Sequence, residues 1–156
     1  MKTINLLAAM SLIAIFASPA LAGEETPFKG SLAMVQTGVV QGGTLIVNGS
    51  GVGNATKLGR FSMTYQEQVD LSTGIGRGTY NFVAANGDSL TARFIGTATP
   101  TPDPNILIID ENVTITGGTG RFANAIGTFT VRRVLNLTTG ISTGSFNGAI
   151  SNQGNR

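Results

Sequence analysis

The chain contains the run Thr116-Gly117-Gly118-Thr119-Gly120-Arg121-Phe122-Ala123-Asn124-Ala125-Ile126-Gly127, which fits two different structures. Such a run can hold the phosphates of a nucleotide between a strand and a helix, or it can turn the chain at the end of a β-barrel. The residues that follow, Thr128 to Val131, alternate in polarity with a period of two, which indicates a strand. No Asp or Glu occurs after Glu111, so the acid that binds a ribose in dinucleotide folds is missing. We therefore interpret the run as a barrel corner.

The corner is expected to turn the chain between two strands and to close one end of the barrel. Its glycines permit positive φ where a strand ends, its arginine and phenylalanine cover the barrel end, and its last glycine begins the next strand. The residues assigned to the corner are Gly117, Gly118, Gly120, Arg121, Phe122 and Gly127.

Away from the corner, the chain after residue 22 divides into short alternating segments bounded by Gly, Asn, Asp or Pro. This spacing is typical of an all-β sandwich or barrel, and 22 glycines with many threonines disfavour helix. Asn86-Gly87 predicts a hairpin with a type I′ turn. The predicted strands are 28–36, 43–51, 58–68, 74–84, 88–98, 105–117, 126–136 and 141–151.

One long hairpin is present twice in the sequence. Its turns are Leu71-Ser72-Thr73-Gly74 and Leu137-Thr138-Thr139-Gly140, and the strands on either side match in pattern. Two similar hairpins suit a closed meander, in which every strand pair occupies an equivalent place and no sheet edge is exposed. We therefore predict an all-β, eight-stranded antiparallel β-barrel, with an open sandwich as the alternative.

The corner also carries a resemblance to known families. Its Gly-Gly-Thr-Gly-Arg-Phe sequence, followed by Ala125 and Gly127, resembles the matching stretch of plant dirigent proteins and is similar to that of allene oxide cyclases. Over most of the chain after residue 22, the sequence also resembles a group of secreted bacterial proteins of unknown function. This resemblance is carried by Asn54-Ala55-Thr56-x-Leu58-Gly59-Arg60-Phe61, the two Leu-x-Thr-Gly turns and the same corner. The resemblance implies a dirigent-like or allene oxide cyclase-like barrel whose interior can hold an apolar ligand, and it assigns no catalytic residue. A lipocalin- or streptavidin-like barrel is the alternative, which the absence of tryptophan and the glycine-rich corner disfavour.

Residues 1–22 have the composition of a secretory signal peptide. Lys2 precedes an apolar run from Leu6 to Phe16, and Ala20-Leu21-Ala22 ends in the small-x-small pattern of a cleavage site. The apolar run is shorter than the roughly 20 residues that a transmembrane helix needs. We expect residues 23–156 to form a single domain that is exported to the periplasm or the extracellular space.

Composition excludes several kinds of chemistry. The chain has no cysteine and no histidine, so it lacks thiolate or imidazole groups for nucleophilic catalysis or metal binding. We predict no metal and no cofactor. The formal net charge of +2 predicts no nucleic-acid partner.

Strand phase supplies the candidate functional residues. Tyr65 and Glu67 share one face of a predicted strand with apolar residues, and Arg133 takes the equivalent place in the repeated hairpin. If these faces line the barrel interior, Glu67 and Tyr65 are catalytic candidates, and Glu67 and Arg133, with Arg93 and Asp110 as further candidates, would contact a ligand. The other interpretation places Glu67 and Arg133 in solvent near a barrel mouth.

Three functions fit these features. The first is non-catalytic binding of an apolar small molecule or a surface partner. The second is a cofactor-free cyclase or isomerase in which Glu67 moves a proton, or a dirigent-like activity in the barrel interior. The third is a structural role as a homo-oligomer. The sequence leaves open whether the protein is an enzyme.

Overall fold

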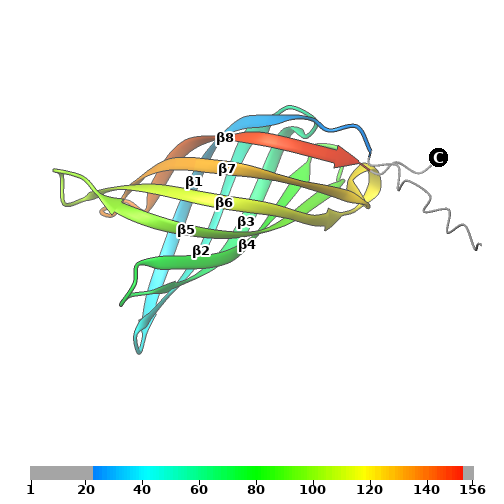
Figure 1. Ribbon diagram of the computed structural model, residues 1–156. Helices are drawn as coiled ribbons and strands as arrows, with labels where there is room; N and C mark the ends of the chain where they lie inside the picture. Colours follow the sequence, from blue (N-terminus) through cyan, green and yellow to red (C-terminus); the bar gives the residue numbers. More distant parts are fainter. Residues whose placement is uncertain (1–22, 153–156) are drawn as a thin grey trace, which may run out of the picture.

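The computed structural model describes residues 23–152, which form a closed antiparallel barrel of eight strands (Figure 1). The strands are β1 (Thr26–Gln41), β2 (Thr44–Ala55), β3 (Gly59–Asp70), β4 (Ile75–Ala84), β5 (Ser89–Pro100), β6 (Ile106–Gly118), β7 (Ala125–Asn136) and β8 (Ile141–Asn152). A single 3-10 turn, η1 (Gly120–Phe122), lies between β6 and β7. The signal peptide predicted for residues 1–22 lies outside the described residues.

The sheet closes because each strand pairs with the next one along the chain and β8 pairs with β1. The predicted eight-stranded barrel is therefore confirmed, and the open sandwich is wrong. All eight predicted strands are present, although β1 continues to Gln41, well beyond its predicted end at residue 36. Among residues 23–152, no helix is long and apolar enough to cross a membrane.

The turn between β4 and β5 differs from its predicted type. Of the two residues Asn86 and Gly87, the glycine alone has positive φ, at 89°, whereas a type I′ turn requires it at both. The Gly87 amide donates to the carbonyl of Ala84, and the side chain of Asn86 accepts from the Asp88 amide at 3.1 Å. The hairpin is present, but a local side-chain hydrogen bond stabilises a wider turn.

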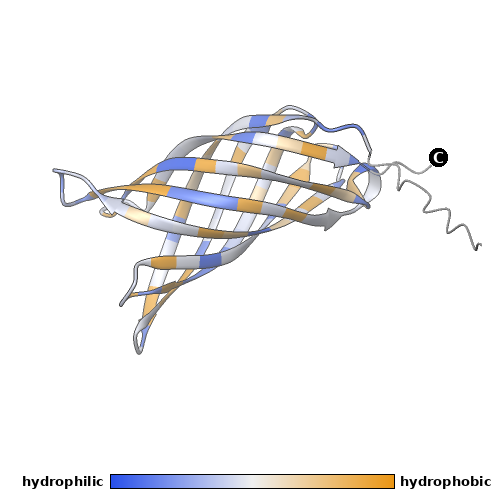
Figure 2. Ribbon diagram, viewed as in Figure 1, coloured by the Kyte–Doolittle hydropathy of each residue, from blue (hydrophilic) through white to orange (hydrophobic). Residues whose placement is uncertain are grey.

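The interior of the barrel, its lumen, is filled with aromatic side chains over much of its length. Phe28 packs against Phe129 and Phe146 with ring centroids 5.2 and 5.1 Å apart, and Phe61 packs edge-on against Phe82 at 5.4 Å. Edge-to-face and tilted contacts of this kind are favourable beyond their buried area. Polar and apolar residues alternate along the strands (Figure 2), so that the apolar ones face this core.

Glycines on neighbouring strands make room for the large side chains of the lumen. Gly53 pairs with Phe61, and a Cβ at Gly53 would collide with the Phe61 ring. Gly148 pairs with Phe129 in the same way, with the Phe129 Cβ 2.6 Å from where a Cβ would lie. A large residue opposite a glycine can fill the space that the missing side chain leaves.

The glycine-rich corner connects β6 to β7 through η1. Gly117, Gly120 and Gly127 have φ values of 138°, 55° and 150°, in the region that L side chains rarely adopt. Gly118 is not among the residues with positive φ. Its requirement is for space, because a Cβ there would collide with the carbonyl oxygen of Ser89.

The basic and the aromatic residue of the corner, Arg121 and Phe122, close one end of the barrel. Phe122 is fully buried in the core. The Arg121 guanidinium lies 4.8 Å from the Phe122 ring centroid and donates to the Leu58 carbonyl at 3.3 Å. At the opposite end, the β1–β2 and β3–β4 hairpins extend in one direction and the β5–β6 hairpin in another (Figure 1). The barrel thus has a closed end at η1 and a mouth at these hairpins.

Replacing Phe122 by alanine is expected to lower the free energy of unfolding by about 3–5 kcal/mol, because a fully buried ring is removed. The matched control is Ile126→Ala, four residues along the chain and 49% exposed, which should change stability by less than about 0.5 kcal/mol. Urea unfolding followed by circular dichroism measures both. An equal decrease in the free energy of unfolding in the two variants would contradict the conclusion that Phe122 packs into the core at the closed end.

Candidate functional site

A belt of polar side chains crosses the lumen between the aromatic core and the mouth. The belt is centred on Arg133, which is 2% exposed, and it includes two carboxylates, Glu67 and Glu111, at 8% and 2% exposure. Groups as polar as these are buried where they are paired or hydrogen-bonded. The polar belt consists of Gln36, Tyr65, Glu67, Tyr80, Glu111, Arg133 and Ser142.

Glycines create the room that each charged group of the belt occupies. Arg133 on β7 pairs with Gly144 on β8, where an added Cβ would lie 2.7 Å from the Arg133 Cβ. Glu111 on β6 pairs with Gly96 on β5, where a Cβ would lie 2.7 Å from the Glu111 Cγ. A Cβ on a third glycine of the lumen, Gly76 of β4, would collide with the Glu67 carboxylate.

Arg133 is bound mainly to Glu111. Its Nε and Nη2 atoms both donate to Oε1 of Glu111, at 3.2 and 2.8 Å. Its Nη1 atom donates to Gln36 Oε1 at 3.2 Å and to Ser142 Oγ at 3.4 Å. Arg133 therefore connects β7 to β1, β6 and β8 inside the barrel.

Two tyrosines complete the belt from the side of the aromatic core. The Tyr80 hydroxyl donates to Glu111 Oε2 at 2.5 Å, and its ring stacks on Phe94 with centroids 4.4 Å apart. The Tyr65 hydroxyl donates to Gln36 Oε1 at 2.6 Å. Both oxygens of Glu111 are therefore occupied, one by the guanidinium and the other by a phenol.

Glu67 has a different environment from Glu111. Its Oε2 atom lies 3.8 Å from Nη2 of Arg133, which is within reach of an ion pair but beyond a hydrogen bond. Burial raises the pKa of Glu67 to about 7; the Arg133 guanidinium opposes the rise and the Glu111 carboxylate adds to it. Glu67 is thus a buried acid that exchanges its proton near neutral pH.

The remaining pKa shifts in the belt follow from burial and from Glu111. Burial raises the pKa of Tyr65 to about 12, against the opposing effect of Arg133. Burial, reinforced by the Glu111 carboxylate, raises the pKa of Tyr80 well above its ordinary value. Burial lowers the pKa of Arg133, but the combined effect of the Glu111 carboxylate, Tyr80 and Tyr65 outweighs it, and the pKa is raised. Both tyrosines are neutral and Arg133 is charged at physiological pH.

A cavity of about 250 Å³ lies at the mouth, and the polar belt forms its floor. Gln36, Glu67 and Arg133 are the belt residues that line it. Its walls come from β2, β3, β5, β6 and β7 and from two turns, with Leu71 and Leu137 at the rim. We call this cavity the mouth pocket; its apolar walls include Leu45, Val69, Ala98, Leu107, Ile109 and Leu135.

The structure brings together three of the candidates derived from the sequence and separates the other two from them. Tyr65, Glu67 and Arg133 all lie in the polar belt, buried inside the barrel and not in solvent. Asp110 lies on the outer surface, where it forms an ion pair with Arg132 at 2.9 Å. Arg93 is likewise exposed on the outer face of β5.

Four belt residues were not predicted from the sequence: Gln36, Tyr80, Glu111 and Ser142. Glu111 had a usable signal, because it stands in phase with the buried residues Val113 and Ile115. The preceding run 106–109 is apolar at every position, which hides the phase when the strand is followed from its start. Gln36 and Ser142 carry no comparable signal.

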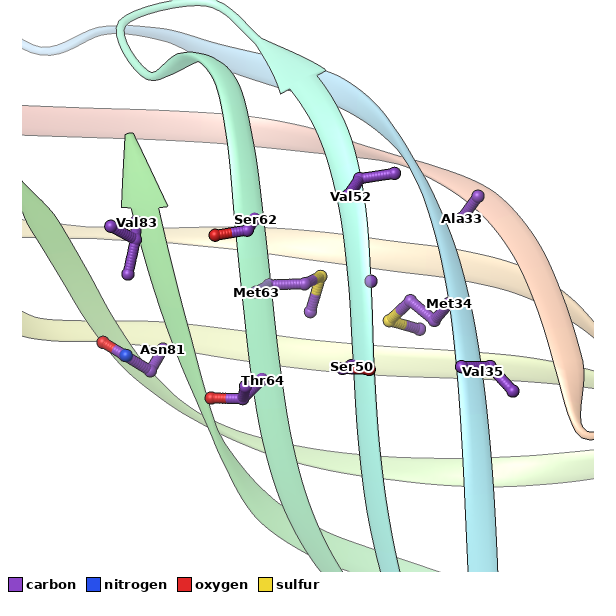
Figure 3. A pocket seen from close by; sticks show the side chains of 11 residues that line it. Ala33, Met34, Val35, Ser50, Val52, Ser62, Met63, Thr64, Asn81 and Val83 are labelled. Carbon is purple, nitrogen blue, oxygen red and sulfur yellow. The ribbon is translucent and has the colours of Figure 1, made fainter. Parts of the chain in front are cut away.

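A second, shallow cleft lies on the outer face of β1–β4 (Figure 3). It is lined by small and apolar side chains, including Ala33, Val35 and Val52, with Asn81 at one side. Val35 and Val52 are 50% and 62% exposed. No charged side chain lines this cleft, so it offers no group for proton transfer or ion pairing.

The chemistry available to the mouth pocket is therefore that of a carboxyl group next to apolar walls. Within residues 23–152, no cluster of three or more His, Cys, Asp or Glu side chains is placed to hold a metal ion.

Comparisons with protein-family models, with curated proteins and with solved structures found no match to this chain.

The stability of the protein is expected to fall as Glu67 ionises. Its pKa is about 7 when folded against an ordinary value of 4.5, so the folded state holds the proton more tightly than the unfolded one. The free energy of unfolding should then decrease between pH 4.5 and about 7, by up to about 3 kcal/mol. Urea unfolding at several pH values between these limits measures the decrease.

The Glu67→Gln variant isolates this contribution, because it cannot ionise. Its free energy of unfolding should fall less between pH 4.5 and about 7 than that of the native protein. The difference in stability between the variant and the native protein should therefore shift in favour of the variant as pH rises. Glu25→Gln, an exposed residue at the start of the barrel, should keep the pH dependence of the native protein. An identical pH dependence in the Glu67→Gln variant and the native protein would show that this carboxyl is ionised as easily when folded as when unfolded.

Proposed function

We propose that this protein binds a small apolar molecule in the mouth pocket without transforming it. The observation that carries the proposal is the pocket itself, a cavity of about 250 Å³ with apolar walls and a polar floor. Ligand sites of proteins are typically concave and apolar with a few placed polar groups, and most hold about 300–1,000 Å³. The pocket is slightly smaller than this range and suits a correspondingly small ligand.

The rest of the lumen supports a site at the mouth and not deeper in the barrel. The aromatic residues below the polar belt are almost completely buried and pack against one another. Arg133, Glu111 and Tyr80 close the space between this core and the mouth pocket. A ligand would therefore rest on the belt with its apolar part against the walls.

A second function, cofactor-free proton transfer in a cyclase or isomerase, is favoured by one observation. Glu67 faces an apolar cavity with a pKa of about 7, which is the range in which a carboxyl can serve as a general base or acid at neutral pH. The hydroxyl of Tyr65, the other catalytic candidate, donates a hydrogen bond to Gln36. We place binding first because the volume and apolar walls of the pocket support it directly, whereas proton transfer rests on Glu67 alone.

We also propose that the protein is exported and that its barrel is related to the dirigent and allene oxide cyclase barrels. The signal-like residues 1–22 and the glycine-rich corner support these proposals. A surface partner or a homo-oligomer would use the outer cleft near Val35 and Val52. That cleft is shallower and lacks charged groups, so the mouth pocket is the better supported site.

Binding is expected to depend on the open space of the mouth pocket. The neutral apolar dye N-phenyl-1-naphthylamine should bind saturably with an increase in fluorescence, and Ala98→Trp should abolish binding by filling the pocket. Val52→Trp, which places the same side chain in the outer cleft, should leave binding intact. Loss of binding in the Val52→Trp variant alone would move the site to the outer face.

A second experiment separates binding from catalysis. Small apolar molecules that co-purify with the protein or bind to it are recovered after long incubation and analysed by mass spectrometry and NMR. Unchanged structures support a binding protein. A bound compound that is converted to an isomer by the native protein and not by Glu67→Gln would instead establish the proton-transfer function.

A further inference from the structure

Glu67 is the one carboxylate of the polar belt whose hydrogen-bonding capacity is unused. Among residues 23–152, no hydrogen bond ends on either of its oxygens, whereas Glu111 accepts from Arg133 through one oxygen and from Tyr80 through the other. The nearest cationic atom, Nη2 of Arg133, lies 3.8 Å away and already donates to Glu111 at 2.8 Å. Glu67 lines the mouth pocket, so its free oxygens face the space in which a ligand would lie.

The charges of the belt do not balance. It contains one guanidinium and two carboxylates, so with both acids ionised the floor of the pocket carries a net charge of −1. Tyr65 and Tyr80 remain neutral because burial raises the pKa of both. An unpaired charge in an apolar site is unfavourable, and it is neutralised either by a proton or by a bound cation.

An anionic ligand finds no partner at this floor. Arg133 makes four hydrogen bonds, to Glu111, Gln36 and Ser142, and it is almost completely buried. A ligand carboxylate would therefore have to displace Glu111 while standing next to Glu67. A ligand ammonium meets the opposite situation, since Glu67 presents two free acceptor oxygens and a compensating charge.

We propose that Glu67 binds the ammonium group of an amphiphilic amine whose alkyl chain occupies the mouth pocket. The proposal rests on the function proposed above and specifies the ligand class for the same site. The geometry places the charged group against the belt and the chain against Leu45, Leu107 and Leu135 on three different strands. A primary ammonium offers three donors, and the two carboxylate oxygens of Glu67, which lines the pocket, can accept from it.

The amine competes with a proton for Glu67, so binding depends on pH. The charged and titratable groups that act on Glu67 are Arg133 on β7, Glu111 on β6 and Tyr65 on its own strand. The pKa of Glu67 lies near neutrality, at about 7. The affinity for an alkylammonium should therefore rise as pH increases through this value, whereas the affinity for a neutral alcohol should stay constant.

The test compares three eight-carbon probes that differ in the head group: octylammonium, 1-octanol and octanoate. Isothermal titration calorimetry with the native protein at pH about 8 should give an affinity for octylammonium at least about tenfold above that for octanol, with octanoate the weakest. At pH about 5 the preference for the amine over the alcohol should fall to about threefold or less as Glu67 takes up a proton.

Two variants tie the preference to Glu67. Glu67→Gln should reduce the affinity for octylammonium to that for octanol at pH about 8. Gly76→Ala should have the same effect while keeping the carboxylate in the chain, because its new Cβ would displace the Glu67 carboxylate. The control Glu25→Gln makes the same chemical change on the exposed surface and should retain the preference.

The outcomes separate this proposal from the function on which it rests. If octanol and octanoate bind and octylammonium does not exceed them, the amine proposal is overturned while apolar binding stands. If none of the three probes binds at either pH, both proposals are overturned. If octylammonium binds equally well to the native protein and to Glu67→Gln, the ammonium is held elsewhere and the role of Glu67 is overturned.

Discussion

The buried guanidinium of Arg133 is the interaction around which the interior of this barrel is organised. A charge that is 2% exposed needs compensation from its surroundings, and here the compensation comes from different strands: Glu111 on β6, Gln36 on β1 and Ser142 on β8. A buried ion pair of this kind is weak evidence for added stability, because desolvation offsets the attraction. Its structural consequence is specific. Arg133 donates hydrogen bonds to Glu111, and it donates none to Glu67, whose nearest oxygen lies 3.8 Å from Nη2.

This assignment gives the lumen three layers with different properties. Below the belt, aromatic rings fill the barrel down to Phe122 at the closed end. Apart from the Glu67 oxygens, which face the mouth pocket, the belt satisfies its polar atoms, since no fully buried side-chain nitrogen or oxygen in residues 23–152 lacks a partner. Above it, at the opposite end from η1, lies the mouth pocket with its apolar walls. The acid at the interface of the last two layers is Glu67.

Much of the fold could be predicted from the sequence because the relevant signals are local. Period-two alternation located all eight strands, and the corner at Gly117 to Gly127 was found from its glycines. Strand phase also grouped Tyr65, Glu67 and Arg133, since residues two apart on a strand share a face. The type of the turn at Asn86 was predicted wrongly, because side-chain hydrogen bonds competed with the backbone preference.

The charge pairing at the site could not be predicted in this way. Glu111 is hidden by an apolar run whose two faces look alike in the sequence, so Asp110, its outward-facing neighbour, was chosen instead. The room for Glu111 comes from Gly96, and that relation exists only in the register between β5 and β6. Which of two carboxylates binds Arg133 depends on contacts between strands far apart in the chain, and neither spacing nor composition encodes them.

The pKa of Glu67 tests most directly whether Arg133 is hydrogen-bonded to Glu111 and leaves Glu67 without a hydrogen bond. The carboxyl carbon of Glu67, followed by carbon-13 NMR in the folded protein and assigned with the Glu67→Gln variant, should titrate with a midpoint of about 7. A midpoint at or below the ordinary value of 4.5 would contradict the account, because it would mean that Arg133 holds Glu67 as a charged partner.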